Sequence, residues 1–151
     1  MANTQAMATS FKGELLTATH NFGTAPTRGT SAADSFKAAL YLASATINAS
    51  TTVYTVTGEV SGTGYTAGGV GVGSWNAPTT SGTTGYTTPT ASITYTSVTL
   101  TTAFDAVLIY NSTQSNKAVS VHTFGSQTVT AGTFTLTMPA NTSTTALIRL
   151  A

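Results

Sequence analysis

Six side chains in this sequence could serve acid–base or metal chemistry. They are the two histidines, His20 and His122, and the four carboxylates, Glu14, Asp34, Glu59 and Asp105. No two of them have the spacing of a zinc motif such as H-x-x-x-H or H-E-x-x-H, and no G-x-S-x-G sequence marks a hydrolase nucleophile. We predict that His20 caps the C-terminal end of a short helix and that His122 is a structural residue of a strand. The sequence predicts no catalytic residue, no metal site and no cofactor, hence a protein that is not an enzyme.

The glycine-rich stretch SGTGYTAGGVGVGSW, residues 61–75, invites comparison with a nucleotide-binding loop. It lacks the G-x-G-x-x-G spacing, no basic residue lies between Glu59 and Lys117, and no helical pattern follows it. A phosphate group would therefore find neither a charge nor a helix N-terminus here. These glycines predict turns, bulges and close backbone packing.

The aromatic residues of the same region, Tyr65, Trp75 and Tyr86, allow two interpretations. They could form a sugar-binding face, or they could anchor a glycine-rich loop on the sheet beneath it. The first interpretation leads to a carbohydrate-binding or adhesive module, and the second leads to a structural role.

The composition predicts the elements that must hold these side chains. Charged residues make up 6% of the chain, and threonine fills about a quarter of it, whereas an ordinary domain has roughly 25% charged residues. Threonine is β-branched and suits a pleated sheet with one face in water. A net charge of +1 is too small to attract polyanions, so neither nucleic acid nor a membrane is an expected partner. No N-terminal export signal is evident, which predicts a chain made in the cytoplasm.

The pattern along the chain predicts an all-β protein, either a jelly-roll-like domain or a β-sandwich, with a short N-terminal helix or arm. Alternating or apolar runs predict strands at DSFKAALYLAS, TTVYTVTGEV, ASITYTSVTLTT, FDAVLIYNST, KAVSVHTF, QTVTAGTFTLTMP and TTALIRLA. The run Phe104 to Tyr110 is the predicted central strand, covered on both faces. A phase change at Val98 predicts a bulge or bend. Residues 58–90 predict a Gly/Thr-rich region of long loops with short edge strands.

Residues 1–22 form a predicted N-terminal arm or short helix, and residues 23–151 form a single β-domain. The helix candidate is TSFKGELLTATHNF, and the sequence GTAPTRGTSAAD predicts a loop that separates it from the strands. Its apolar residues are candidates for partner binding: Met7, Phe11, Leu15 and Leu16. A short helix is marginal alone, so this one should dock either on its own β-domain or in a groove of a partner.

Three phrases carry a family resemblance: TSFKGELLTATHNF, DSFKAALYLASATINASTTVYTVTGEVSGTGYTAGG and AGTFTLTMPANTSTTALIRL. Together they resemble a family of small virion structural proteins of tailed bacteriophages, and the resemblance leaves out chiefly residues 74–90. It implies a capsid decoration (cement) protein, or else a head-fibre or tail component. The expected location is the virion, on the outer capsid surface, after synthesis in the host cytoplasm.

The resemblance also implies a partner. A decoration protein would bind across neighbouring subunits of the major capsid protein. Apolar faces with few charges predict self-association as a dimer or trimer, which would match a symmetry site on a shell. The alternative stays open: a carbohydrate-binding or adhesive module of a phage tail or head fibre.

Overall fold

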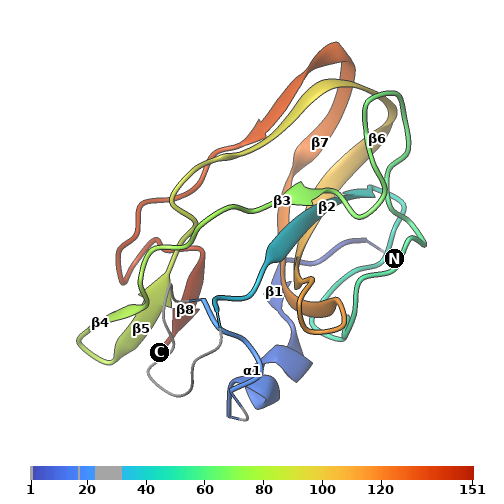
Figure 1. The fold of residues 1–151 in the computed structure, drawn as a ribbon. Coiled ribbons are helices and arrows are strands. Elements are labelled where there is room, and N and C mark those ends of the chain that lie inside the picture. The colour runs from blue at the N-terminus through green and yellow to red at the C-terminus, as the bar shows by residue number, and fades with distance from the viewer. Residues whose placement is uncertain (1, 17, 23–31) are drawn as a thin grey trace.

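The computed structural model describes residues 2–16, 18–22 and 32–151, and most of the predicted loop at 23–34 lies outside these residues. The protein is all-β, with two antiparallel sheets (Figure 1). The larger sheet has the order β1-β7-β6-β2-β3: Ala6–Met7, Lys117–Leu136, Ile93–Asn111, Phe36–Leu42 and Val70–Gly71. The smaller sheet has the order β4-β5-β8: Thr79–Ser81, Thr84–Thr87 and Ile148–Leu150. The predicted all-β class is confirmed, and jelly-roll connectivity stays a prediction.

The helix α1 covers Thr9–Leu16, which is shorter than the predicted helix over 9–22. It ends because Ala18 adopts a left-handed conformation with φ 55°. The N–H of Ala18 then donates to the carbonyl of Leu15, and the N–H of Thr19 donates to the carbonyl of Glu14. This pair of bonds is a Schellman motif, which satisfies the last carbonyls of the helix and turns the chain away.

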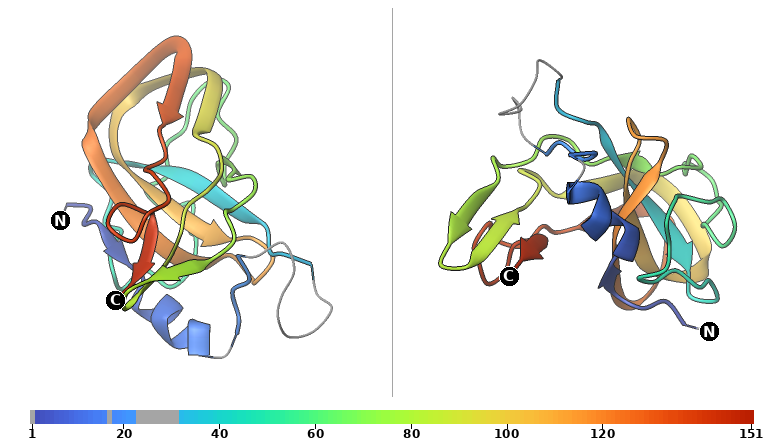
Figure 2. Two further views of the ribbon diagram at one scale, coloured as in Figure 1. Left: turned by 90° about the vertical axis from the view of Figure 1, so that its left-hand side faces the viewer. Right: turned by 90° about the horizontal axis from the view of Figure 1, so that it is seen from below.

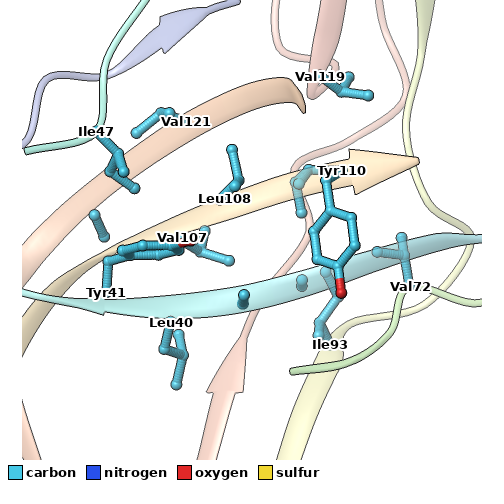
Figure 3. Packing of buried hydrophobic residues seen from close by; sticks show 14 of the residues in the cluster. Leu40, Tyr41, Ile47, Val72, Ile93, Val107, Leu108, Tyr110, Val119 and Val121 are labelled. Atoms are coloured by element: carbon cyan, nitrogen blue, oxygen red, sulfur yellow. The ribbon is translucent and has the colours of Figure 1, made fainter. Parts of the chain in front are cut away.

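The strands β2 and β6 lie in the middle of the larger sheet and are buried on both faces. In β2, Leu40 and Tyr41 point to opposite sides, yet both are fully buried. Figure 3 shows Leu40 and Ile93 on one side of β2, and Leu108 with Val121 on the other. The prediction of Phe104–Tyr110 as a central strand covered on both faces is confirmed, since β6 pairs with β2 and β7.

The strands β6 and β7 form one long, bent ribbon rather than the four separate strands predicted at 91–102, 104–113, 117–124 and 127–139. Register shifts interrupt their pairing between Tyr95 and Val98 and again before Phe104, so the predicted irregularity at Val98 is confirmed. The bent ribbon folds back over its own sheet (Figure 1). As a result the ring of Phe134 lies 5.0 Å from that of Phe104, and the Tyr95 hydroxyl donates to the carbonyl of Ala38. Much of the core is enclosed between the two halves of one hairpin.

The predicted strand TTVYTVTGEV is wrong. This segment is a loop that meets the strands through isolated bridges, such as Tyr41 to Glu59, and through side-chain contacts, such as the hydrogen bond from the Tyr41 hydroxyl to the Thr55 carbonyl. Val53 and Val56, which are three residues apart, face outward and are 44% and 66% exposed. Tyr54 and Glu59 point inward instead, because they hydrogen-bond each other. The alternation therefore does not mark a face that packs on the core.

Residues 58–90 run as loops joined to the short strands β3, β4 and β5. The backbone of this region lies directly on the larger sheet. Gly69 has φ +69°, and a Cβ atom there would lie 1.7 Å from the carbonyl oxygen of Ala38. Only glycine permits this close approach.

Candidate functional site

The N-terminal segment is part of the β-domain. β1 adds to the edge of β7, with Ala6 opposite Val121. The backbone N–H of Ala8 donates to Val119, and that of Thr9 donates to Ala49. Figure 2 shows α1 lying against one end of the strands. Main-chain hydrogen bonds thus hold the segment to the β-domain just before α1 and at the first residue of α1.

The structure places the predicted partner-binding residues mostly in the chain's own core. Phe11 is 0% exposed, with its ring centroid 4.7 Å from His20 and 5.9 Å from Phe22. Met7 and Leu15 are half-buried and pack against the same core. The side chain of Leu16 lies outside the described part of the structure. Of the two docking alternatives, the structure has the one on its own β-domain, and it leaves Phe11 inaccessible to a partner.

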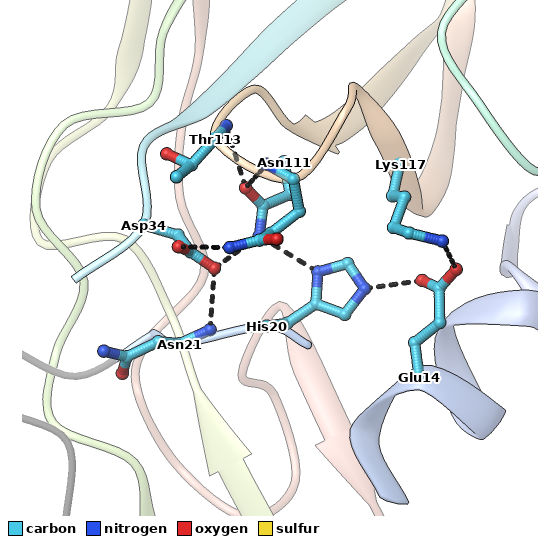
Figure 4. Close-up of polar contacts among 8 residues, drawn as sticks. Glu14, His20, Asn21, Asp34, Asn111, Thr113 and Lys117 are labelled. Carbon is cyan, nitrogen blue, oxygen red and sulfur yellow. Dashed lines mark hydrogen bonds and ion pairs between the residues drawn. The ribbon is translucent and has the colours of Figure 1, made fainter. Parts of the chain in front are cut away.

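A polar network holds the end of this segment against the β-domain (Figure 4). His20 Nε2 lies 2.7 Å from Glu14 Oε2, and His20 Nδ1 lies 3.1 Å from the Asn111 amide nitrogen. Asn111 is fully buried at the end of β6, and its amide also donates to Asp34 Oδ2 at 2.7 Å. Asp34 in turn accepts from the backbone N–H of Asn21 at 3.0 Å.

Glu14 is also paired with a cation. Lys117 Nζ, at the start of β7, lies 2.5 Å from Glu14 Oε1. Partial burial acts to raise the pKa of Glu14, but the hydrogen bonds from Lys117 and His20 outweigh it and hold this pKa below its usual value. The carboxylate therefore joins the helix to the β-domain in its charged form.

The predicted role of His20 as a helix cap is wrong. The last carbonyls of α1 accept from the backbone N–H groups of Ala18 and Thr19, as described above, and the His20 ring binds the Glu14 side chain. Sequence reasoning missed two other residues of this network, Asn111 and Lys117. Asn111 lies 91 residues from His20 and Lys117 lies 103 residues from Glu14, so no local spacing joins them. Correlated changes at positions 14 and 117 among relatives would be the signal for this contact.

The remaining carboxylates are also bound inside the chain. Glu59 is 7% exposed and accepts from the Tyr54 and Tyr65 hydroxyls at 2.6 and 2.7 Å and from the Gly68 N–H at 2.8 Å. Asp105 accepts from the Asn3 amide at 2.6 Å. All four carboxylates of the chain thus have hydrogen-bond donors within the chain.

The tyrosines near Glu59 are kept in their neutral form. Burial, followed by the hydrogen bond to Glu59, raises the pKa of Tyr65 above its ordinary value. Burial is also the main cause that raises the pKa of Tyr41 to about 12. Neutral hydroxyls can donate to a buried carboxylate, as those of Tyr54 and Tyr65 do to Glu59.

Two of the three aromatic residues considered for sugar binding are engaged in packing. Trp75 is 5% exposed, and its ring lies 4.7 Å from Phe22 and 5.4 Å from Phe36. The Tyr65 ring stacks on Tyr95 at 6.0 Å. Tyr86 lies half-buried in β5. These rings anchor the glycine-rich region and do not form a common exposed face.

The surroundings of the two histidines determine whether either ring could act as an acid or a base. His20 meets a carboxylate, but its ring is fully buried and both nitrogens have partners. His122 bonds the Ser120 hydroxyl at 2.8 Å, and burial lowers its pKa to about 4. Among the described residues there is no group of three or more His, Cys, Asp or Glu that could hold a metal ion. No helix within the described ranges is long and apolar enough to span a bilayer.

No protein-family model, curated protein or solved structure matches this chain.

Proposed function

We propose that this chain is a non-enzymatic structural protein of a bacteriophage virion, a capsid decoration protein that binds across neighbouring subunits of the major capsid protein. The proposal begins with the sequence resemblance to small virion proteins of tailed phages. It places the protein on the outer surface of the head, where it self-associates as a dimer or trimer.

The observation that carries the proposal is that the carboxylates of the chain are bound by its own hydrogen-bond donors. Its four carboxylates are committed to internal bonds: Glu14 and Asp34 fix the N-terminal segment, Glu59 fixes the glycine-rich loops, and Asp105 holds Asn3. An acid–base reaction at a carboxylate, or a contact steered by negative charge, would need such groups at an accessible surface. A scaffold of this kind instead suits attachment through neutral hydrogen bonds and apolar burial.

We assign the capsid contact to the bend of the β6–β7 ribbon. The residues exposed there are uncharged and mostly hydroxylic: Thr101, Thr102, Ala103, Gly125, Ser126, Gln127 and Thr128. Figure 1 shows this bend at one extremity of the molecule, away from α1. Because paired strands support it, the surface can dock with little loss of conformational entropy.

The alternative function, a carbohydrate-binding or adhesive module, loses the site on which it depended. It required Tyr65, Trp75 and Tyr86 to present their rings together, and the first two are packed against other aromatic rings. A glycan array still offers a direct test of this alternative.

The test is binding to purified heads that lack the protein. We expect saturable co-sedimentation that persists in 1 M salt, because screening weakens neutral contacts little. Thr128→Glu should reduce binding at least tenfold by placing a charge in the contact, whereas Thr128→Ser should bind normally. The matched control is Thr80→Glu, which adds the same charge on the exposed strand β4.

Each outcome has a definite meaning. Absence of the protein from purified virions, binding to tails alone, or release from heads at moderate salt would overturn the decoration role. Equal losses for Thr128→Glu and Thr80→Glu would overturn the assignment of the contact to the ribbon while leaving the role itself in place.

A further inference from the structure

A cavity of about 240 Å³ lies between the inner halves of β6 and β7 and the chain that follows β7. It is partly open to solvent and is separate from the His20 network. Its apolar lining includes Ile93, Val107, Ile109, Phe124, Leu136 and Leu147. The first three are at most 3% exposed, so they form a rigid floor, while the other three are half-buried.

The polar groups of the cavity come from a few residues. Gln5, His122, Thr123 and Thr137 contribute to the lining, and among the residues that the structure describes no Lys, Arg, Asp or Glu side chain does so. His122 is fixed by the buried Ser120 hydroxyl at 2.8 Å. Its lowered pKa keeps the imidazole neutral, so the ring keeps one donor and one acceptor nitrogen. The Thr123 hydroxyl lies 3.5 Å from Gln5 Oε1, a long and weak contact, so the exposed Gln5 side chain can turn toward a ligand.

The size of the cavity limits what it can hold. An apolar cavity of about 150 Å³ lined by Leu, Ile and Phe binds benzene. A cavity of about 240 Å³ therefore accommodates one aromatic ring with a few further atoms. Met138, which also lines it, is a residue type that makes favourable contacts with aromatic rings. An ionic ligand would lose its hydration without gaining a counter-charge.

We propose that this cavity binds a small uncharged phenol, with the aromatic ring on the floor formed by Ile93, Val107 and Ile109 and the hydroxyl group bonded at the His122 and Gln5 end. The inference does not depend on the virion role. It assigns to the chain a small-molecule site of the usual composition, a mainly apolar pocket with a few orienting polar groups.

The test uses p-cresol as the probe, with toluene and 4-methylbenzoate as its apolar and charged analogues. Titration followed by methyl NMR should give saturable shifts at Ile93 and Ile109, with a Kd on the order of 1 mM or below. Toluene should bind several-fold more weakly, and 4-methylbenzoate should not bind. Nuclear Overhauser contacts from the ring protons to these two methyl groups should locate the probe.

Two variants sharpen the result. Leu147→Phe fills the cavity and should weaken p-cresol binding at least tenfold, whereas Leu150→Phe makes the same change at an exposed site outside the cavity and should leave it unchanged. His122→Phe should bring p-cresol affinity down to that of toluene.

Absence of saturable shifts, or equal effects of the two Leu→Phe changes, would overturn the site. Equal binding of p-cresol and toluene by the unmodified protein would overturn the phenol assignment. If Leu147→Phe does not fold, the contacts of p-cresol with Ile93 and Ile109 in the unmodified protein decide the question.

Discussion

Replacing Phe11 with alanine tests whether the N-terminal segment is part of the folded core. Phe11 is completely buried and packs edge-on against the rings of His20 and Phe22. Removing a buried phenylalanine ring costs about 3–5 kcal/mol, through lost transfer free energy and the cavity left behind. Because a domain of this kind has a total stability of about 5–15 kcal/mol, the loss would be a large share of the whole.

Urea unfolding followed by circular dichroism and tryptophan fluorescence measures this loss. With a slope of about 2 kcal/mol/M, a loss of about 4 kcal/mol moves the midpoint down by about 2 M. The matched control is Lys12→Ala, on the exposed side of the same helix, which should change the free energy of unfolding by less than about 0.5 kcal/mol. Trp75 contacts Phe22, so its fluorescence reports on the region next to the segment. Equal stability of the two variants would refute the docked position of α1.

Further predictions follow from the core, the loops and the polar network. Gly69→Ala should destabilise the protein strongly, because its Cβ would collide with the Ala38 carbonyl, whereas Gly71→Ala meets nothing within 4 Å and should be nearly neutral in urea unfolding. Leu108→Asp places an unpaired charge at a site that is 0% exposed and should abolish soluble, folded expression. Glu14 has a lowered pKa in the folded state, so its contribution is present above its ordinary pKa of about 4.5 and is lost as the pH falls through the folded value. Glu14→Gln should therefore be less stable than the parent at pH 7, and the difference should shrink at pH 3; a constant difference would contradict the ion pair.

The sequence predicted those parts of the fold that depend on local pattern. Composition indicated the all-β class, and the run at 104–110, which is apolar except for Asp105, marked the central part of β6 because strands covered on both faces need such runs. The phase change at Val98 correctly marked the irregular pairing of β6 with β7. Each of these features depends on residues that are neighbours in the sequence.

The sequence failed where one pattern is compatible with two structures. Val53 and Val56 lie in a run that mixes apolar and polar residues as many strands do, yet both face solvent, while Tyr54 hydrogen-bonds the buried Glu59. Similarly, a turn between residues 100 and 104 and a bend within one strand look alike in sequence. The choice between them depends on the pairing of β6 with β7, which is a tertiary contact.

The N-terminal segment shows most clearly why such contacts escape local reasoning. Its apolar residues predicted that the segment has a face that docks on another surface. Such a face fits the groove of a partner as well as the chain's own β-domain. Polar contacts decide where the segment docks. Asn111 contacts His20, and Lys117 contacts Glu14, each across about a hundred residues of sequence. A buried asparagine amide and histidine ring lose their hydration on folding, and only complementary partners at the right positions offset that loss. This matching restricts the segment to one position on its own β-domain.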